Sequence, residues 1–169
     1  MTTVFYTAAA VAIVATVLAL TRANAVHGLL YLVVSLLAVA LIFFVAGAPF
    51  VAALEVVIYA GAIIVMFLFV VMLVSLGSKA IEEERRFLGA STWLGPAALA
   101  SVLLVELVVV LRSLAVPLAY TSEIGPARVG ATLYGPYLIA VELASLLLLS
   151  ALIGAVHLGR RTLGKGDPP

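Results

Sequence analysis

Three glutamates interrupt long apolar runs of the chain: Glu55, Glu106 and Glu142. An acidic residue near the centre of a membrane-spanning helix costs about 2.5–3.5 kcal/mol on insertion scales, so such residues commonly have a role. Burial disfavours the charged form of a carboxyl group, which therefore can take up and release a proton inside the membrane. Proton transfer is one chemistry that these side chains suit, and hydrogen bonding between helices is the other.

The three acids differ in depth. Glu55 and Glu142 lie about four and about five residues into their runs, or about 6 to 8 Å at 1.5 Å per residue. Glu106 lies about thirteen residues in and is the deepest. Glu55 also suits a plain role at a helix start, facing the positive end of the helix dipole. For Glu106 and Glu142, a hydrogen bond to a neighbouring helix is as compatible with the sequence as a proton relay.

The stretch from Glu55 to Ala62 combines a carboxyl group, a phenol and a helix-weakening residue. Glu55 and Tyr59 are four residues apart and share a face of a helix. Gly61 costs about 1 kcal/mol relative to alanine inside a helix. Because this apolar run is longer than a bilayer requires, the stretch is a candidate for a kink or a π-bulge. Close packing of another helix against Gly61 is the alternative explanation.

The composition shows which elements position these residues. The chain has 169 residues, of which 66% are hydrophobic and 10% charged, whereas soluble domains are about 45–50% apolar and about 25% charged. The apolar runs have no polar stripe, which predicts helices that cross a membrane. We therefore predict an all-α, polytopic membrane protein, with a single membrane domain over 1–169. The five predicted spans cover about 4–21, 28–46, 51–76, 92–112 and 136–158.

The distribution of basic residues predicts an orientation. With the N-terminus outside and the C-terminus in the cytoplasm, the cytoplasmic segments carry most of the cations, as the positive-inside rule requires. These cations are Arg22, Lys79, Arg85, Arg86, Arg160, Arg161 and Lys165, whereas the outside segments carry only Arg112 and Arg128. Residues 77–91 are then a cytoplasmic loop. Residues 113–135 are a periplasmic loop, with room for a short interfacial segment around Val129 to Tyr134.

Several functions are disfavoured by what the sequence lacks. The chain has no cysteine, which removes thiolate metal sites, cysteine-ligated iron–sulfur clusters and cysteine nucleophiles. A formal net charge of +1 without a long basic run argues against nucleic acid as a partner. We found no phosphate-binding loop, nucleophile elbow or HExxH motif. The sequence therefore predicts no catalytic residue, no bound cofactor and no metal site in this chain.

Three stretches resemble a known family: Ala25 to Leu32, Gly47 to Met72, and Tyr134 to Ser145. They are similar to the subunit J family of bacterial NADH-quinone oxidoreductase, respiratory complex I, whose mitochondrial counterpart is called chain 6. The resemblance covers nearly the whole chain, and the block from Glu55 to Met72 is its most specific part. It implies a five-helix subunit of the membrane arm of a complex that passes electrons from NADH to a quinone and moves protons.

The resemblance also implies roles for particular residues. In the family, a π-bulge in the third helix converts to regular helix and gates a hydrated proton path. That hinge corresponds here to Tyr59, Ala60 and Gly61, with Val65 and Met66 just beyond it.

The family also has acids at the positions of Glu55 and Glu142, as expected for a proton path or polar contacts between helices. Glu106 falls outside the family pattern, although we keep it as a candidate because of its depth.

The resemblance further implies partners and a location. The partners are the lipid bilayer and other membrane-arm subunits, namely subunits A, H and K and an antiporter-like subunit. NADH, FMN, the iron–sulfur clusters and quinone belong to partner subunits, so this chain is a non-redox subunit of a translocase in the bacterial inner membrane. The alternatives are a related subunit of a cation/proton antiporter or membrane hydrogenase, a purely structural assembly subunit, and a free-standing small transporter.

Overall fold

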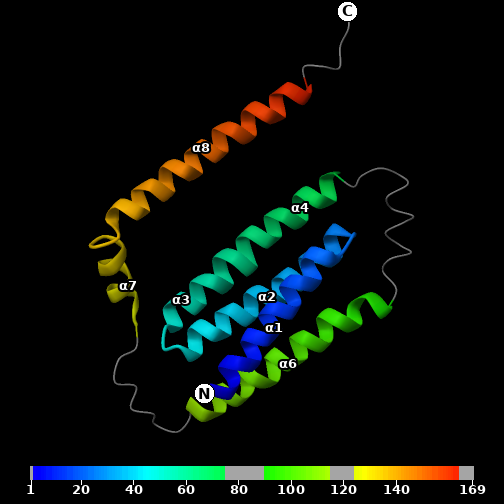
Figure 1. The fold of residues 1–169 in the computed structure, drawn as a ribbon, viewed down its shortest axis with the longest axis vertical. Coiled ribbons are helices and arrows are strands. Elements are labelled where there is room, and N and C mark those ends of the chain that lie inside the picture. The colour runs from blue at the N-terminus through cyan, green and yellow to red at the C-terminus, as the bar shows by residue number, and fades with distance from the viewer. Residues whose placement is uncertain (1, 75–89, 115–123, 164–169) are drawn as a thin grey trace, which may run out of the picture. The chain divides into compact units, whose positions relative to one another are not determined.

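The computed structural model describes residues 2–74, 90–114 and 124–163, and every regular element within these ranges is a helix (Figure 1). The all-helical character predicted from the sequence is therefore confirmed for the described residues. Five helices are long and apolar enough to cross a membrane. They cover Thr2–Thr21, Ala25–Val45, Pro49–Met72, Trp93–Arg112 and Leu138–Gly159. The end of the predicted third span, at 76, and most of the predicted loop 77–91 lie outside the described residues.

The chain divides into two compact units, Met1–Ile124 and Gly125–Pro169, where the sequence suggests one membrane domain. The first unit contains four of the five candidate spans, and the second contains one. Large apolar side chains are exposed in both units, as expected of helices that meet lipid or other subunits.

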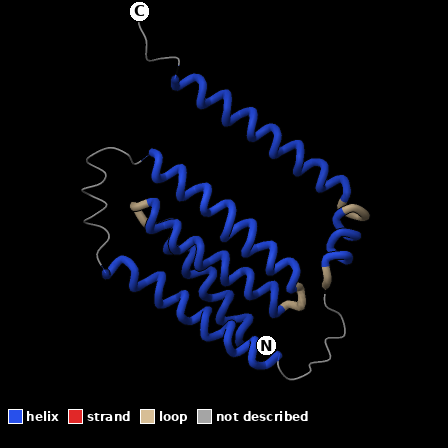
Figure 2. The backbone as a smooth tube through the Cα atoms, turned by 180° about the vertical axis from the view of Figure 1, so that it is seen from behind, coloured by secondary structure: helices blue, strands red, loops and turns tan. Residues whose placement is uncertain are grey.

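The core of the first unit is formed by α1 (Thr2–Thr21) and α2 (Ala25–Val45), which lie side by side (Figures 1 and 2). Alanines carry the contact: Ala8, Ala15 and Ala38 are completely buried. Small side chains let two helices approach closely in a membrane. A hydroxyl pair adds a polar contact between the helices, because Thr16 Oγ1 and Ser35 Oγ lie 2.7 Å apart and Ser35 Oγ also donates to the Ala12 carbonyl oxygen.

Two short turns connect the helices around this core. Before α2, the side chain of Asn24 accepts a hydrogen bond from the backbone N–H of His27 and so caps the helix. After α2, Gly47 has a φ of +84°, a conformation that side chains with a β-carbon rarely adopt. Pro49 then occupies the first turn of the next helix, where its missing N–H is not needed.

The third span is one long helix in three parts. It begins with α3 (Pro49–Leu54), continues as the π-helix η1 (Glu55–Ile63) and ends as α4 (Ile64–Val74). All three parts contact α2.

The fourth span, α6 (Ala90–Leu114), packs against both α1 and α2. Its Leu103 joins the buried cluster between those helices. Near the start of α6, Gly95 leaves a notch into which the phenol of Tyr31 from α2 fits, since a β-carbon on Gly95 would overlap the Tyr31 hydroxyl. Tyr31 is only 3% exposed.

The second unit consists of α7 (Pro126–Leu133) and α8 (Leu138–Leu163). The short helix α7 overlaps the stretch around Val129 to Tyr134, where the sequence suggests a short interfacial segment. It begins at a proline, and the Tyr134 backbone N–H bonds to the Gly130 carbonyl at its end. Within its own unit, the membrane-crossing window of α8 has no buried residue.

Candidate functional site

The most unusual backbone in the described chain is the π-helix η1, at Glu55–Ile63 in the middle of the third span. At its end, the backbone N–H of Ile64 points to the carbonyl of Tyr59, five residues back, as well as to that of Gly61. Regular α-helix flanks it on both sides. Short π-helical segments are rare and frequently occur at functional sites. The segment coincides with the stretch where the sequence suggests a kink or a π-bulge.

Gly61 has a local reason to be glycine. A β-carbon at this position would lie 3.2 Å from the carbonyl oxygen of Val56, which is tighter than an ordinary contact. Apart from the nearest turn of its own helix, no other described atom lies within 4 Å of that β-carbon. Within the described chain, therefore, no second helix packs on Gly61, and the close neighbour is the π-helix's own backbone.

The side chains of the segment are turned largely toward the surroundings of the first unit. Glu55 is half-buried and Tyr59 is 50% exposed. Neither side chain makes a hydrogen bond to another described residue. The helix face that carries these two polar groups is thus open to whatever lies beside the unit.

The other residues of the predicted hinge lie on the same continuous helix. Ala60 and Gly61 are half-buried within η1. Val65 and Met66 lie in the first turn of α4 and are 53% and 59% exposed. The structure thus brings the acid, the phenol and the hinge residues together on one helix, which projects its large apolar side chains outward.

Glu106 lies elsewhere, on the packed side of α6. Its neighbours along the helix at positions three before and four after, Leu103 and Val110, are both buried. The Glu106 Oε2 atom is also buried and has no hydrogen-bond partner among the described residues. The carboxyl group of Glu106 therefore has a different setting from the exposed face of η1.

Glu142 belongs to the second unit. It lies in the second turn of α8 with an exposed side chain, and its backbone carbonyl accepts a hydrogen bond of 2.7 Å from the Ser145 hydroxyl. Within its own unit, this carboxyl group is available to a partner outside the chain.

Two features were not foreseen from the sequence. The first is an aromatic and cationic cluster at the start of α2, where the Arg22 guanidinium carbon lies 5.2 Å from the centre of the Tyr31 ring and the His27 ring lies 5.2 Å from it. The His27 Nε2 atom is buried without a described partner. The tyrosine within the apolar run of α2 is the sequence feature that could have indicated this cluster. Its contact with Gly95 could not be predicted, because the two residues are far apart in the sequence.

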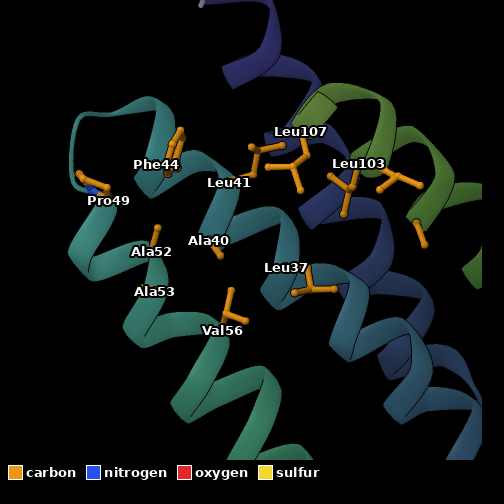
Figure 3. A pocket seen from close by; sticks show the side chains of 12 residues that line it. Leu37, Ala40, Leu41, Phe44, Pro49, Ala52, Ala53, Val56, Leu103 and Leu107 are labelled. Atoms are coloured by element: carbon orange, nitrogen blue, oxygen red, sulfur yellow. The ribbon is translucent and has the colours of Figure 1, made fainter. Parts of the chain in front are cut away.

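The second is a cavity of about 410 Å³ in the first unit, between α2, the start of the third span and α6 (Figure 3). Every lining side chain is apolar. The lining residues are Leu37, Ala40, Leu41, Phe44, Pro49, Ala52, Ala53, Val56, Ala100, Leu103, Leu104 and Leu107. Four of the lining residues are alanines, whose small side chains leave space between helices, and they are the sequence feature that could have indicated a cavity.

Among the described residues, no three histidine, aspartate or glutamate side chains are grouped so that they could hold a metal ion. The carboxyl group of Glu55 and the phenol of Tyr59 can take part in hydrogen bonds, and both lie on a helix whose backbone is irregular at the same place.

Comparison with known proteins supplies the family. The family model of NADH-ubiquinone/plastoquinone oxidoreductase chain 6 matches residues 15–158. NADH-quinone oxidoreductase subunit J of Pseudomonas aeruginosa is 54% identical over 159 residues, which covers 93% of this chain and 95% of that protein. The subunit J of Escherichia coli K12 is 47% identical over 156 residues, covering 92% of this chain and 85% of the relative.

A third relative extends the same pattern. NADH-quinone oxidoreductase subunit J of Buchnera aphidicola subsp. Schizaphis graminum is 46% identical over 157 residues, which covers 93% of this chain and 96% of the relative. The similarity therefore runs through all five candidate spans. The chain belongs to the NADH-ubiquinone/plastoquinone oxidoreductase chain 6 family.

Proposed function

We propose that the chain is subunit J in the membrane arm of proton-pumping NADH-quinone oxidoreductase and helps to couple quinone reduction to proton translocation. The three relatives that carry the name subunit J match it over 92% of its length or more. The observation that carries the coupling role is the π-helix at Glu55–Ile63, with Gly61 inside it.

The proposed mechanism is a change of helical form. When η1 converts to regular α-helix, the segment loses one residue from its wide turn and everything beyond it rotates by about 100°. Val65 and Met66 lie directly beyond η1 and move with that rotation. An apolar side chain is then exchanged for open space beside the helix, which opens or closes a hydrated path for protons.

Gly61 makes the change reversible. A β-carbon would crowd the Val56 carbonyl in the π form, whereas α-helix accommodates alanine readily. A side chain at this position therefore shifts the balance toward the α form. Glycine keeps the two forms close in free energy, as a gate that must move in both directions requires.

Glu55 and Tyr59 supply the polar groups of the path. Both lie within η1 and have no hydrogen-bond partner among the described residues, so they are free to bind water or a group of a neighbouring subunit. Glu142 has the same availability on α8, and Glu106 is a buried acceptor on α6. In this proposal these carboxyl groups hold or pass protons and no electron passes through the chain.

The surroundings follow from the same proposal. The chain lies in the bacterial inner membrane with its N-terminus outside and its C-terminus in the cytoplasm, in contact with subunits A, H and K and an antiporter-like subunit. NADH, FMN, the iron–sulfur clusters and quinone are bound by other subunits. The exposed apolar surfaces of η1, α4 and α8 fit such a buried position in a larger assembly.

Replacement of Gly61 tests the coupling role. In the intact complex, we expect Gly61→Val to lower both quinone reduction and proton pumping by about tenfold or more, the effect of about 1.4 kcal/mol at a coupling step. Ala62→Val is the matched control, because Ala62 is the exposed next residue of the same helix. Equal activity of the Gly61→Val variant and the wild type, with normal assembly, contradicts the proposal.

A further inference from the structure

The partly open apolar cavity of the first unit has no part in the proposed function. Its lining comes from three elements: α2, the α3 and η1 part of the third span, and α6. Figure 3 shows the labelled side chains of Leu41, Leu103 and Leu107 gathered between the helices, with Pro49 at the turn that follows α2. All the lining positions fall within the candidate membrane spans.

The size and the chemistry of the cavity limit what it can hold. A volume of about 410 Å³ is within the range of about 300–1,000 Å³ typical of ligand sites. Such sites normally contain a few polar groups that orient the ligand, yet every side chain here is a hydrocarbon. An occupant with donors or acceptors would lose its hydrogen bonds to water without replacement. The cavity therefore fits a flexible hydrocarbon chain.

A cationic side chain lies at the end of the helix that closes the cavity. Arg112 is exposed in the last turn of α6. It lies five residues beyond Leu107, or about 7.5 Å further along the helix axis. A long arginine side chain at a helix end reaches toward the membrane surface, and its guanidinium group binds phosphate with two parallel hydrogen bonds.

We propose that this cavity binds one acyl chain of a phospholipid whose phosphate group is bound by Arg112. The hydrocarbon lining accepts the chain, and the charge of Arg112 is complementary to the phosphate at the level where a headgroup lies. The α2–α3 turn, held at Gly47 by a hydrogen bond from the Ile124 backbone N–H of 3.0 Å, covers the same end of the helices. The lipid is thus a structural partner that fills the space between α2, α3 and α6.

Photocrosslinking tests the acyl-chain site. The probe is a phosphatidylglycerol with a diazirine on one acyl chain, added to the intact complex in mild detergent, and the labelled peptides are identified by mass spectrometry. We expect label on the lining segments of α2 and α6. Ala53→Leu, which fills the cavity from an exposed lining position, removes most of that label, and Leu104→Phe does the same from α6. Ala98→Leu, an exposed alanine of α6 outside the lining, leaves the label unchanged.

Arg112 is tested with two probes. We expect Arg112→Gln to weaken labelling by the phosphatidylglycerol about tenfold, as for the loss of a charge-assisted hydrogen bond, and to leave labelling by a diazirine fatty alcohol unchanged. Arg128→Gln in α7 is the control. The proposal is overturned if the lining segments carry no label, if Ala53→Leu leaves the label unchanged, or if a cysteine introduced at Ala53 crosslinks to a helix of another subunit, because a protein side then fills the cavity.

Discussion

Two regions of the first unit differ in how closely their helices pack. Between α1, α2 and α6, completely buried alanines bring the backbones together, and the hydroxyls of Thr16 and Ser35 bond to each other and to the backbone. Along η1 and α4, by contrast, nearly every large side chain is exposed and the backbone departs from α-helix. The first region is closely packed, whereas the second has few packing contacts within the unit.

Because of this difference, we expect substitutions in the two regions to affect different properties of the complex. In the packed region, an added atom has no space, so substitutions lower stability first. Under the proposed function, an added atom in the π-helical region changes the preferred helical form, so we expect substitutions there to change activity first.

Ala15→Leu produces the largest expected loss of stability. Ala15 is 0% exposed between α1 and α2, and overpacking of a tight interface costs about 1–3 kcal/mol. We expect less chain in the assembled complex and a lower midpoint of thermal dissociation on native gels. Ala10→Leu, on the exposed side of the same helix, is the control. Similar behaviour of the two variants is evidence against close packing of α1 on α2.

Gly95→Ala tests the contact between α2 and α6. The new methyl group overlaps the hydroxyl of buried Tyr31, and we expect a cost in the lower half of the overpacking range of about 1–3 kcal/mol. Tyr31→Phe removes that hydroxyl and is expected to restore part of the stability of the double variant. The readout is again the thermal midpoint of the complex. Additive effects of the two changes would mean that the side chains do not touch.

The Thr16 and Ser35 pair gives a smaller effect. Interhelical hydrogen bonds in membranes average about 0.6 kcal/mol in double-mutant cycles, and these hydroxyls lie 2.7 Å apart. A cycle built from Thr16→Val and Ser35→Ala is expected to give a coupling energy of about that size in the stability of the complex. A coupling energy of zero would show that the two hydroxyl groups bond only to the Ala12 backbone carbonyl.

The sequence alone predicts the local features of the helices but not the contacts between them. The spans, the irregular helix around Gly61 and the depth of Glu106 depend on local composition and spacing, which a single sequence contains. The notch at Gly95 and the cavity beside Ala53 depend on which helices become neighbours. Nothing in the apolar runs specifies that pairing, because leucine and alanine pack equally well against many partners.

Gly61→Ala has the smallest expected effect on stability. It most directly tests the difference between the π-helical region and the packed region. The methyl group meets the Val56 carbonyl at 3.2 Å in the π form, and alanine favours α-helix over glycine by about 1 kcal/mol. These terms oppose each other in the π form, so the thermal midpoint of the complex changes little, whereas the balance between the forms moves toward α. We expect quinone reduction and proton pumping to fall together, with a milder loss than for Gly61→Val. Ala62→Gly, which replaces the neighbouring alanine with glycine, controls for the effect of helix propensity.

If Gly61→Ala lowers the thermal midpoint as strongly as Ala15→Leu, then η1 is packed as tightly as the α1–α2 core in the complex, and it cannot be the element that moves.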